Sequence, residues 1–257
     1  MIEFYSGRRG DLAVPKNRYE RSRIKMNELM LDTANLEELE YGLSKWPVVG
    51  VTSNPSILKK EGAIDVYERL NTIRRLCTNG RSLHIQVVSS TTDAIIEEAK
   101  TIISKIGHDT YIKIPVSEAG LPAIKALAKE GVNVTATGIY TTMQGVLAVL
   151  AGAKYIAIYY NRMEDNCTDA DRVIEQIRSF IDESGSSAKI LAASFKNVAE
   201  IVSAFASGAH SATVSYSLIK KALSLPSIDS AVDVFRRDFE EIHGEGQTMA
   251  TIAEKSK

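Results

Sequence analysis

The chain has 257 residues, of which 44% are hydrophobic, and its 31 basic and 32 acidic residues leave a formal net charge of −1. This length suits one α/β barrel or two small domains, and the composition supports a sizeable core. The near-neutral charge argues against nucleic acid or a membrane surface as a partner of the whole chain, and no apolar run is long enough to predict a membrane span.

The cysteines and histidines show no disulfide or metal-binding pattern. Cys77 and Cys167 lie far apart and outside any CxxC pair, so neither a disulfide framework nor a zinc site is predicted. The N-terminus lacks the apolar core of a secretory signal, and we expect a cytoplasmic protein in a reducing compartment. The scattered histidines are expected to be structural or surface residues: His84, His108, His210 and His243.

Residues 1–25 differ in charge from the rest of the chain. They hold seven basic and three acidic residues, a net charge of +4, so the other 232 residues carry −5. Their composition predicts a disordered basic leader, such as an added segment or the product of an upstream start codon. The alternative is a basic arm that binds an acidic partner. The folded domain is expected over residues 26–257.

Short apolar runs typical of strands recur about every 25 residues, and helical patterns lie between them. The predicted strands are, in chain order, Leu29–Thr33, Val48–Thr52, Leu83–Val88, Thr110–Pro115, Val132–Thr137, Tyr155–Tyr159, Lys189–Ala193 and Ala212–Val214. The helical patterns include Thr92–Ser104, Ala119–Glu130, Thr142–Ala151, Asp169–Ser184, Val198–Ser207 and Tyr216–Leu223. Glycines fall at or just past the ends of four of these helices, as C-cap glycines do.

Eight β-α units without a break in composition predict a single closed (β/α)8 TIM barrel. The alternative is an open doubly wound sheet, which more often has a glycine-rich phosphate loop after its first strand. The segment Thr33–Leu36 contains no such loop. Beyond the eighth unit, Ser227–His243 predicts an extra C-terminal helix whose apolar stripe covers either a barrel end or a neighbouring subunit.

Lys113 lies in the middle of the apolar strand pattern Tyr111–Val116. Desolvation disfavours the ammonium ion, so a lysine inside a barrel has a lowered pKa and a free amine near neutral pH. Such an amine can form a Schiff base with a ketone. Lys113 faces the barrel axis if Ile112 and Ile114 face the helices, and a one-residue change of register would reverse this. The alternative is an edge-strand lysine with its head group in solvent.

Other polar residues fall at or near the ends of the predicted strands, where a barrel gathers its active-site groups. They are Asp32, Thr52, Asn54, Gln86, Thr137, Tyr159, Arg162 and Ser194. An acid, an amide, a lysine, a hydroxyl, a phenol and an arginine at one barrel mouth suit carbonyl chemistry on a phosphorylated substrate.

Each of these residues also has a purely structural interpretation. Asp32 is alternatively the N-cap of the first helix, and Asn54 a turn residue before a proline. Arg162 is alternatively part of an exposed ion pair with Glu164 or Asp165. Three of the residues are alternatively buried groups that pair with one another: Gln86, Thr137 and Tyr159.

Several segments resemble the transaldolase family, in the right order along the chain. They are Leu31–Asn35, Gly50–Ser56, Ile112–Val116, Leu150–Tyr155, Asn161–Arg162 and Leu191–Lys196. The resemblance runs from about Met26 to His243. The short length without insertions is similar to the small-subunit branch, which includes fructose-6-phosphate aldolases and short transaldolases.

The resemblance implies a role for several of these residues. Lys113 matches the Schiff-base lysine that attacks the ketose carbonyl, and Asp32 matches the carboxylate that handles protons near the sugar hydroxyls. Asn54 matches the amide that binds the dihydroxyacetone moiety, and Thr52 is expected to contact the same substrate. Arg162 and Ser194 match the residues that hold the phosphate, for which an arginine fork is well suited.

Two positions bear on which of the family's two activities the chain has. Transaldolases usually have glutamate at the position of Gln86 and phenylalanine at that of Tyr159, whereas the aldolase branch has glutamine and tyrosine, as here. After C3–C4 cleavage, a tyrosine hydroxyl acting through a water held by Gln86 and Thr137 can protonate the dihydroxyacetone enamine. The favoured function is therefore a class I aldolase that cleaves fructose 6-phosphate, or forms it from dihydroxyacetone and glyceraldehyde 3-phosphate.

Two alternatives remain. The first is a transaldolase that transfers a dihydroxyacetone unit between sugar phosphates, and the second is a barrel without catalysis that serves in binding or assembly. The resemblance implies sugar phosphates as substrates and no metal or organic cofactor, because the lysine serves as the electron sink. It also implies a ring-shaped homo-oligomer, a pentamer or decamer, in which the terminal helix reaches a neighbour through Phe235 and Phe239.

Overall fold

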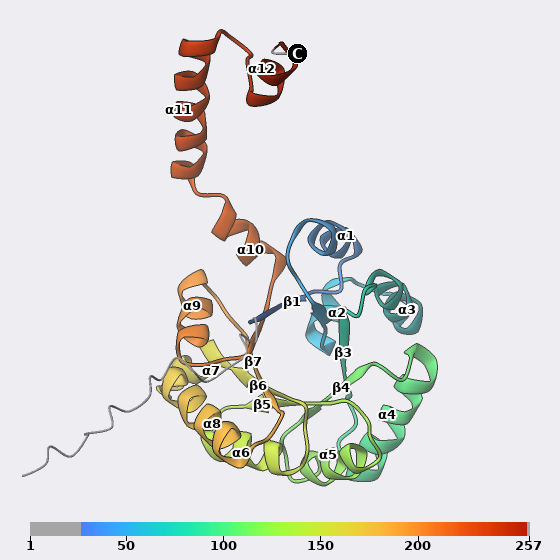
Figure 1. Cartoon of the computed structure of the whole chain (residues 1–257). Coiled ribbons are helices and arrows are strands. Elements are labelled where there is room, and N and C mark those ends of the chain that lie inside the picture. Colours follow the sequence, from blue (N-terminus) through green and yellow to red (C-terminus); the bar gives the residue numbers. More distant parts are fainter. Residues whose placement is uncertain (1–26, 256–257) are drawn as a thin grey trace, which may run out of the picture.

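A computed structural model describes residues 27–255 of the chain. Eight parallel strands pair in sequence order and close into one barrel, with helices around it (Figure 1). This confirms the predicted (β/α)8 fold and excludes the open sheet. The basic segment 1–25 lies outside the described residues, so its disorder stays a prediction.

The eight strands lie close to their predicted positions. They are β1 (Glu28–Asp32), β2 (Gly50–Thr52), β3 (Ser82–Gln86), β4 (Tyr111–Pro115), β5 (Val134–Ile139), β6 (Tyr155–Tyr159), β7 (Lys189–Ala193) and β8 (Ser211–Val214). The largest difference is in β5, which continues past Thr137 to Ile139. A register shift between Ala136 and Ile139 makes this possible, with Gly138 at a φ of +69° that a side chain would disfavour.

The helices include several that were given no range from the sequence, among them α7, which directly follows the sixth strand. The helices are α1 (Leu36–Lys45), α2 (Pro55–Lys60), α3 (Val66–Leu76), α4 (Thr92–Ile106), α5 (Gly120–Lys129), α6 (Thr142–Leu150), α7 (Tyr160–Asp165), α8 (Ala170–Ser184), α9 (Val198–Ala206), α10 (Tyr216–Leu223), α11 (Pro226–His243) and α12 (Met249–Lys255).

Two hydrophobic clusters show which way the strand residues face. Ile112 and Ile114 are fully buried in the large cluster that the strands share with the surrounding helices. Tyr111 instead packs with a small cluster from β1, β6 and β7: Met30, Tyr155, Ala157 and Leu191. Side chains from these separated strands can meet only inside the barrel. Lys113 alternates with Ile112 and Ile114 and therefore faces the interior, as its strand parity predicts.

Polar groups fill the N-terminal end of the barrel interior. The Glu28 carboxylate accepts a hydrogen bond of 2.8 Å from the Tyr155 hydroxyl and pairs with the Lys189 ammonium. The buried His84 ring stacks on Tyr111 with the ring centroids 4.5 Å apart. These contacts close the N-terminal end of the barrel, so that the interior opens toward the C-terminal mouth.

The predicted C-terminal helix is present as α11 and stands away from the barrel, continued by α12 (Figure 1). None of its residues is buried, so it does not cover a barrel end of its own chain. Phe235 is 68% exposed and Ile242 is 78% exposed. Among residues 27–255, no helix is long and apolar enough to cross a membrane.

Candidate active site

The predicted site residues follow the carboxyl ends of their strands. In a closed parallel barrel these ends open on the same face, so the structure brings the residues to one mouth. Four strands end in a predicted site residue: β1 in Asp32, β2 in Thr52, β3 in Gln86 and β6 in Tyr159. Two more residues lie within strands, Lys113 in β4 and Thr137 in β5. The remaining three follow a strand: Asn54 after β2, Arg162 after β6 and Ser194 after β7.

Lys113 is buried inside the barrel, with only 5% of the residue exposed. On the neighbouring strands it pairs in register with Gln86 and Thr135. Burial lowers the pKa of the Lys113 ammonium, and the negative charge of Asp32 opposes that shift in part. The solvent-exposed alternative is therefore wrong. A lowered pKa increases the fraction of neutral amine at a given pH, and the neutral amine is the form that attacks a carbonyl.

The Asp32 carboxylate is held by a chain of buried hydroxyls. Thr52 Oγ1 donates a hydrogen bond of 2.5 Å to Asp32 Oδ1, and Thr213 Oγ1 lies 2.6 Å from Thr52 Oγ1. Since the single hydroxyl hydrogen of Thr52 goes to Asp32, Thr213 is the donor in the second bond. The N-cap alternative for Asp32 is wrong, because the Asn35 side chain caps α1. Thr213, at the end of the eighth strand, was missed in the sequence.

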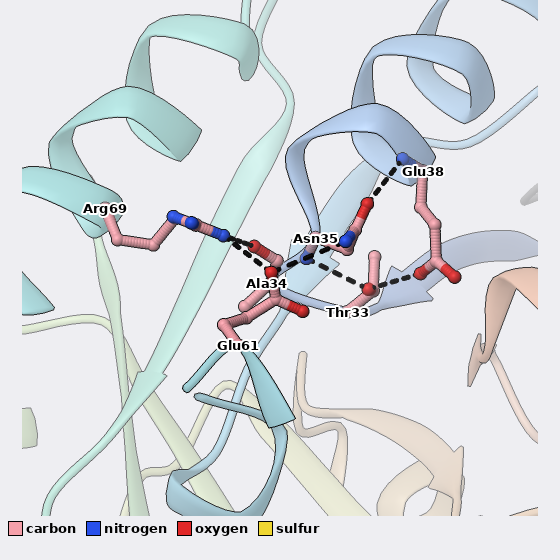
Figure 2. Close-up of polar contacts among 6 residues, drawn as sticks. All are labelled: Thr33, Ala34, Asn35, Glu38, Glu61 and Arg69. Atoms are coloured by element: carbon pink, nitrogen blue, oxygen red, sulfur yellow. Dashed lines mark hydrogen bonds and ion pairs between the residues drawn. The ribbon is translucent and has the colours of Figure 1, made fainter. Parts of the chain in front are cut away.

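A polar network holds the loop that follows Asp32 (Figure 2). Arg69, on α3, donates through Nη1 to the Ala34 carbonyl oxygen and to Glu61 Oε2, both at 2.8 Å. Asn35 Nδ2 donates to the same Glu61 oxygen at 3.4 Å. The Arg69–Glu61 ion pair is shielded, with side chains 19% and 14% exposed, which makes it the least exposed ion pair among residues 27–255.

This network connects the two loops that carry Asp32 and Asn54. Glu61 is the C-cap of α2, and Asn54 is the N-cap of the same helix. The Asn54 side-chain oxygen accepts from the Ile57 N–H at 3.0 Å, which leaves its NH2 group as a donor for another partner. Asn54 is thus a helix N-cap and not a plain turn residue, and this cap fixes the orientation of its side-chain amide. Arg69 was not singled out in the sequence.

The structural alternative was that three buried polar groups pair with one another, namely Gln86, Thr137 and Tyr159. Only two of the three do so. Thr137 Oγ1 donates to the Tyr159 hydroxyl oxygen at 3.1 Å. Gln86 Oε1 is buried and has no hydrogen-bond partner within the described part of the chain. A buried amide oxygen of this kind requires a partner, which a water or substrate hydroxyl can supply.

Tyr159 stays protonated in this environment. Burial raises the pKa of its phenol, although the hydrogen bond from Thr137 and the positive charge of Arg162 oppose that shift. Because Thr137 donates to the phenolic oxygen, the hydrogen of Tyr159 remains available for donation into the site. A neutral phenol with a free hydrogen can act as a general acid.

Arg162 lies on α7, at the edge of the mouth, and forms no ion pair with an acidic residue within the described part of the chain. The expected alternative was an ion pair with Glu164 or Asp165, and it is wrong. Glu164 Oε1 accepts from the Ala170 N–H at 2.8 Å, and Asp165 Oδ2 pairs with Lys196 Nζ at 3.0 Å. The guanidinium is therefore available to an anion.

Two tyrosines surround the Arg162 guanidinium. Its central carbon lies 4.8 Å from the centroid of the Tyr159 ring, and its Nη1 donates to the Tyr140 hydroxyl at 3.3 Å. Tyr140 was missed in the sequence, because it lies beyond the predicted end of the fifth strand and its contact with Arg162, 22 residues away, exists only in the fold.

Ser194 has an unusual backbone that supports a functional role. Its φ is +66°, a left-handed conformation that costs energy for a residue other than glycine. Its carbonyl oxygen accepts from the Asn161 N–H at 3.3 Å, which ties the end of β7 to the helix that carries Arg162. The two residues predicted to hold a phosphate are thus connected through the backbone.

The comparisons with known proteins agree with this geometry. A model of the Transaldolase/Fructose-6-phosphate aldolase family matches residues 29–256. The chain belongs to this family. One relative, from Streptococcus pneumoniae, is 49% identical over 212 residues, which are 82% of this chain and 96% of the relative, and it is described as a probable fructose-6-phosphate aldolase. The chain is therefore an enzyme of the aldolase and transaldolase type, and the interpretation as a barrel without catalysis is not supported.

Proposed function

We propose that this enzyme is a class I aldolase that cleaves fructose 6-phosphate to dihydroxyacetone and glyceraldehyde 3-phosphate, and that also catalyses the reverse reaction. The observation that carries the proposal is Lys113, an interior lysine with a lowered pKa at the mouth of the barrel. The name of the Streptococcus pneumoniae relative supports the substrate.

The first half of the reaction uses Lys113 and Asp32. The neutral Lys113 amine adds to the ketose carbonyl carbon, and loss of water gives an iminium ion. A base then removes the proton from the C4 hydroxyl as the C3–C4 bond breaks. Asp32 is suited to this step because Thr52 fixes one of its oxygens and the other remains for the sugar. The aldehyde product leaves, and the electron pair of the broken bond remains as an enamine on Lys113.

The second half uses Tyr159 and Gln86. The enamine carbon takes up a proton, and water then hydrolyses the iminium ion to release dihydroxyacetone and the free amine. Tyr159 has a neutral hydroxyl whose hydrogen is not used by Thr137. Gln86 Oε1 is buried without a hydrogen-bond partner among the residues that the structure describes, which supports a role in holding the water that carries this proton.

Tyr159 also favours the aldolase over the transaldolase, which is the second candidate. In a transaldolase the enamine waits for an acceptor aldehyde, so a proton donor beside it lowers the yield of transfer. A phenol that burial keeps protonated is such a donor. Arg162 and Ser194 supply the anion site for the phosphate of the aldose half, which both reactions require.

Release of glyceraldehyde 3-phosphate from fructose 6-phosphate, with and without erythrose 4-phosphate, tests the proposal. Release without an acceptor supports the aldolase, whereas release only with erythrose 4-phosphate makes the enzyme a transaldolase. Borohydride reduction in the presence of dihydroxyacetone should add one reduced adduct to Lys113, detected by peptide mass. Absence of this adduct in active enzyme would overturn the Schiff-base mechanism.

We further propose that a second copy of the chain covers α11. Five apolar residues recur at alternating spacings of four and three along this helix, which makes one stripe: Ile228, Val232, Phe235, Phe239 and Ile242. Most helical stability in proteins comes from packing an amphipathic face, and no residue of α11 is buried within the described part of the chain. The family resemblance, with its ring-shaped pentamers or decamers, supports another copy as the partner.

The oligomeric state in solution tests this contact. Light scattering with size exclusion should give a mass that is a multiple of 28.1 kDa. Phe235→Glu places a charge in the stripe and should reduce the mass toward that of one chain. Ser230→Glu, on the opposite face of α11, is the matched control and should leave the mass unchanged. A wild-type monomer would overturn the proposal.

The cytoplasm is the compartment that we propose. Cys77 is buried and Cys167 is exposed, and neither forms a disulfide. Free thiols persist in a reducing compartment. Cell fractionation tests this location, and recovery of the enzyme in a secreted fraction would contradict it.

A further inference from the structure

The Arg162 guanidinium is held by two groups that carry no charge. Within residues 27–255 it takes part in no ion pair, and its contacts are the Tyr140 hydroxyl and the face of the Tyr159 ring. A carboxylate in the same place would orient the arginine but would also neutralise it. Neutral phenols orient the guanidinium and leave its full charge for an anion.

Tyr140 is itself fixed from three directions. It follows β5 directly after the bulge at Gly138, and its backbone N–H donates to Gln144 Oε1 at 2.9 Å. Its ring meets the Tyr159 ring edge-on, with centroids 5.5 Å apart and an angle of 79°. Its hydroxyl is therefore a fixed acceptor rather than a mobile surface group.

We propose that Tyr140 is a positioning residue that pre-orients Arg162 above Tyr159 and thereby makes the enzyme select phosphorylated aldehydes over unphosphorylated ones. Arginine is a long side chain whose immobilisation opposes binding, and a guanidinium already held by an acceptor has less freedom to lose when phosphate arrives.

The inference rests on the proposed function, because it takes the aldose phosphate as the anion that Arg162 binds. It adds a residue that connects this anion site to the proton donor. Tyr140 touches both Arg162 and Tyr159, so the same side chain supports the group that binds the phosphate and the group that protonates the enamine.

The test compares two aldehyde acceptors in the synthetic direction with dihydroxyacetone. Tyr140→Phe removes the hydroxyl and keeps the ring. The ratio of kcat/KM for glyceraldehyde 3-phosphate to that for glyceraldehyde should fall about three- to tenfold, the effect of one lost hydrogen bond. The change should lie in KM for the phosphorylated aldehyde. The matched control is Tyr67→Phe, an exposed tyrosine on α3, which should leave the ratio unchanged.

Three outcomes separate this inference from the proposed function. If the wild-type enzyme does not prefer the phosphorylated acceptor, or if Arg162→Leu leaves that preference intact, the anion site of the proposed function is wrong. If Arg162→Leu abolishes the preference and Tyr140→Phe retains it, the role of Tyr140 is wrong. A fall in both variants supports it.

Inhibition by inorganic phosphate gives a second measurement that does not depend on turnover of a sugar phosphate. In the reaction of dihydroxyacetone with glyceraldehyde, the inhibition constant of phosphate should rise by the same factor in Tyr140→Phe. Borohydride trapping of dihydroxyacetone at Lys113 shows that the variant is folded. An unchanged inhibition constant in a variant that traps normally would overturn the inference.

Discussion

Thr52 Oγ1 lies 2.5 Å from Asp32 Oδ1, and this hydrogen bond joins the ends of two neighbouring strands at the mouth of the barrel. Thr52 is fully buried, and Thr213, on the strand at the other side of β1, donates to it in turn. One oxygen of the carboxylate is thus fixed from within the barrel, and the other is left for the sugar.

Thr52→Val keeps the shape of the side chain and removes this donor. We expect kcat for cleavage to fall about ten- to hundredfold, because a hydrogen bond to a charged group is lost from the proposed base. Steady-state cleavage of fructose 6-phosphate measures the effect. The control is Thr213→Val, which leaves the Thr52–Asp32 bond in place and should cost less activity. Equal losses in the two variants would show that packing, not the orientation of Asp32, is responsible.

Lys113→Met should separate activity from stability. We expect cleavage to fall by at least about a thousandfold, since no other group in the site can form the covalent intermediate. The free energy of unfolding should stay unchanged or rise by up to about 3 kcal/mol, because the variant no longer buries an ammonium ion. Activity assays and urea titrations test both halves. A large loss of stability would mean that Lys113 is a structural residue.

The pH dependence of stability gives a related prediction. The pKa of Lys113 is lower in the folded enzyme than its ordinary value of 10.5. Between these two pKa values the unfolded chain binds more protons at this position, so wild-type stability rises with pH through that window. The advantage of Lys113→Met should therefore be largest below the folded-state pKa of Lys113 and shrink as the pH rises from there towards 10.5. An advantage that does not depend on pH would contradict the lowered pKa.

The order and position of the strands could be predicted because each one is a short apolar run between helical patterns. The inward orientation of the Lys113 side chain could also be predicted. Side chains alternate along β4, so Lys113 faces the interior once Ile112 and Ile114 are placed on the helix side. The end of β5 was not predictable in this way. The bulge at Gly138 depends on pairing with β6, which a local pattern does not contain.

The supporting residues of the site were harder to predict than the reacting ones. The reacting residues, such as Asp32 and Tyr159, stand out in the sequence as polar groups at strand ends. Thr213 and Arg69 look ordinary in the sequence, because their importance comes from partners more than 30 residues away. Only the closed barrel brings β8 beside β1, and only the packing of α3 brings Arg69 to the loop after Asp32.

Tyr159→Phe should change the balance between the two reactions of the family. Without the phenol, the enamine loses its proton donor, and we expect release of glyceraldehyde 3-phosphate in the absence of an acceptor to fall about a hundredfold or more. Transfer to erythrose 4-phosphate should fall much less, because the aldehyde traps the same enamine. Parallel assays with and without the acceptor measure the ratio. Full cleavage activity in the variant would exclude Tyr159 as the donor.

Arg69→Met tests whether the network after Asp32 positions the half of the site that binds dihydroxyacetone. The variant leaves the shielded Glu61 carboxylate without its positive partner and the Ala34 carbonyl without its donor. It should lower the free energy of unfolding by about 1–3 kcal/mol, between the exposed and fully buried limits. The KM for dihydroxyacetone should rise, and Arg69→Lys should restore part of the loss.

Arg74→Met is the matched control for this variant. Arg74 lies on the same helix and pairs with Asp109, but the Asp109 side chain is 63% exposed, so its loss should cost less than about 1 kcal/mol. It should not change the KM for dihydroxyacetone. If Arg69→Met loses stability while that KM stays at the wild-type value, the network supports the fold alone. A rise in KM that Arg69→Lys reverses assigns Arg69 to the positioning of Asp32 and Asn54.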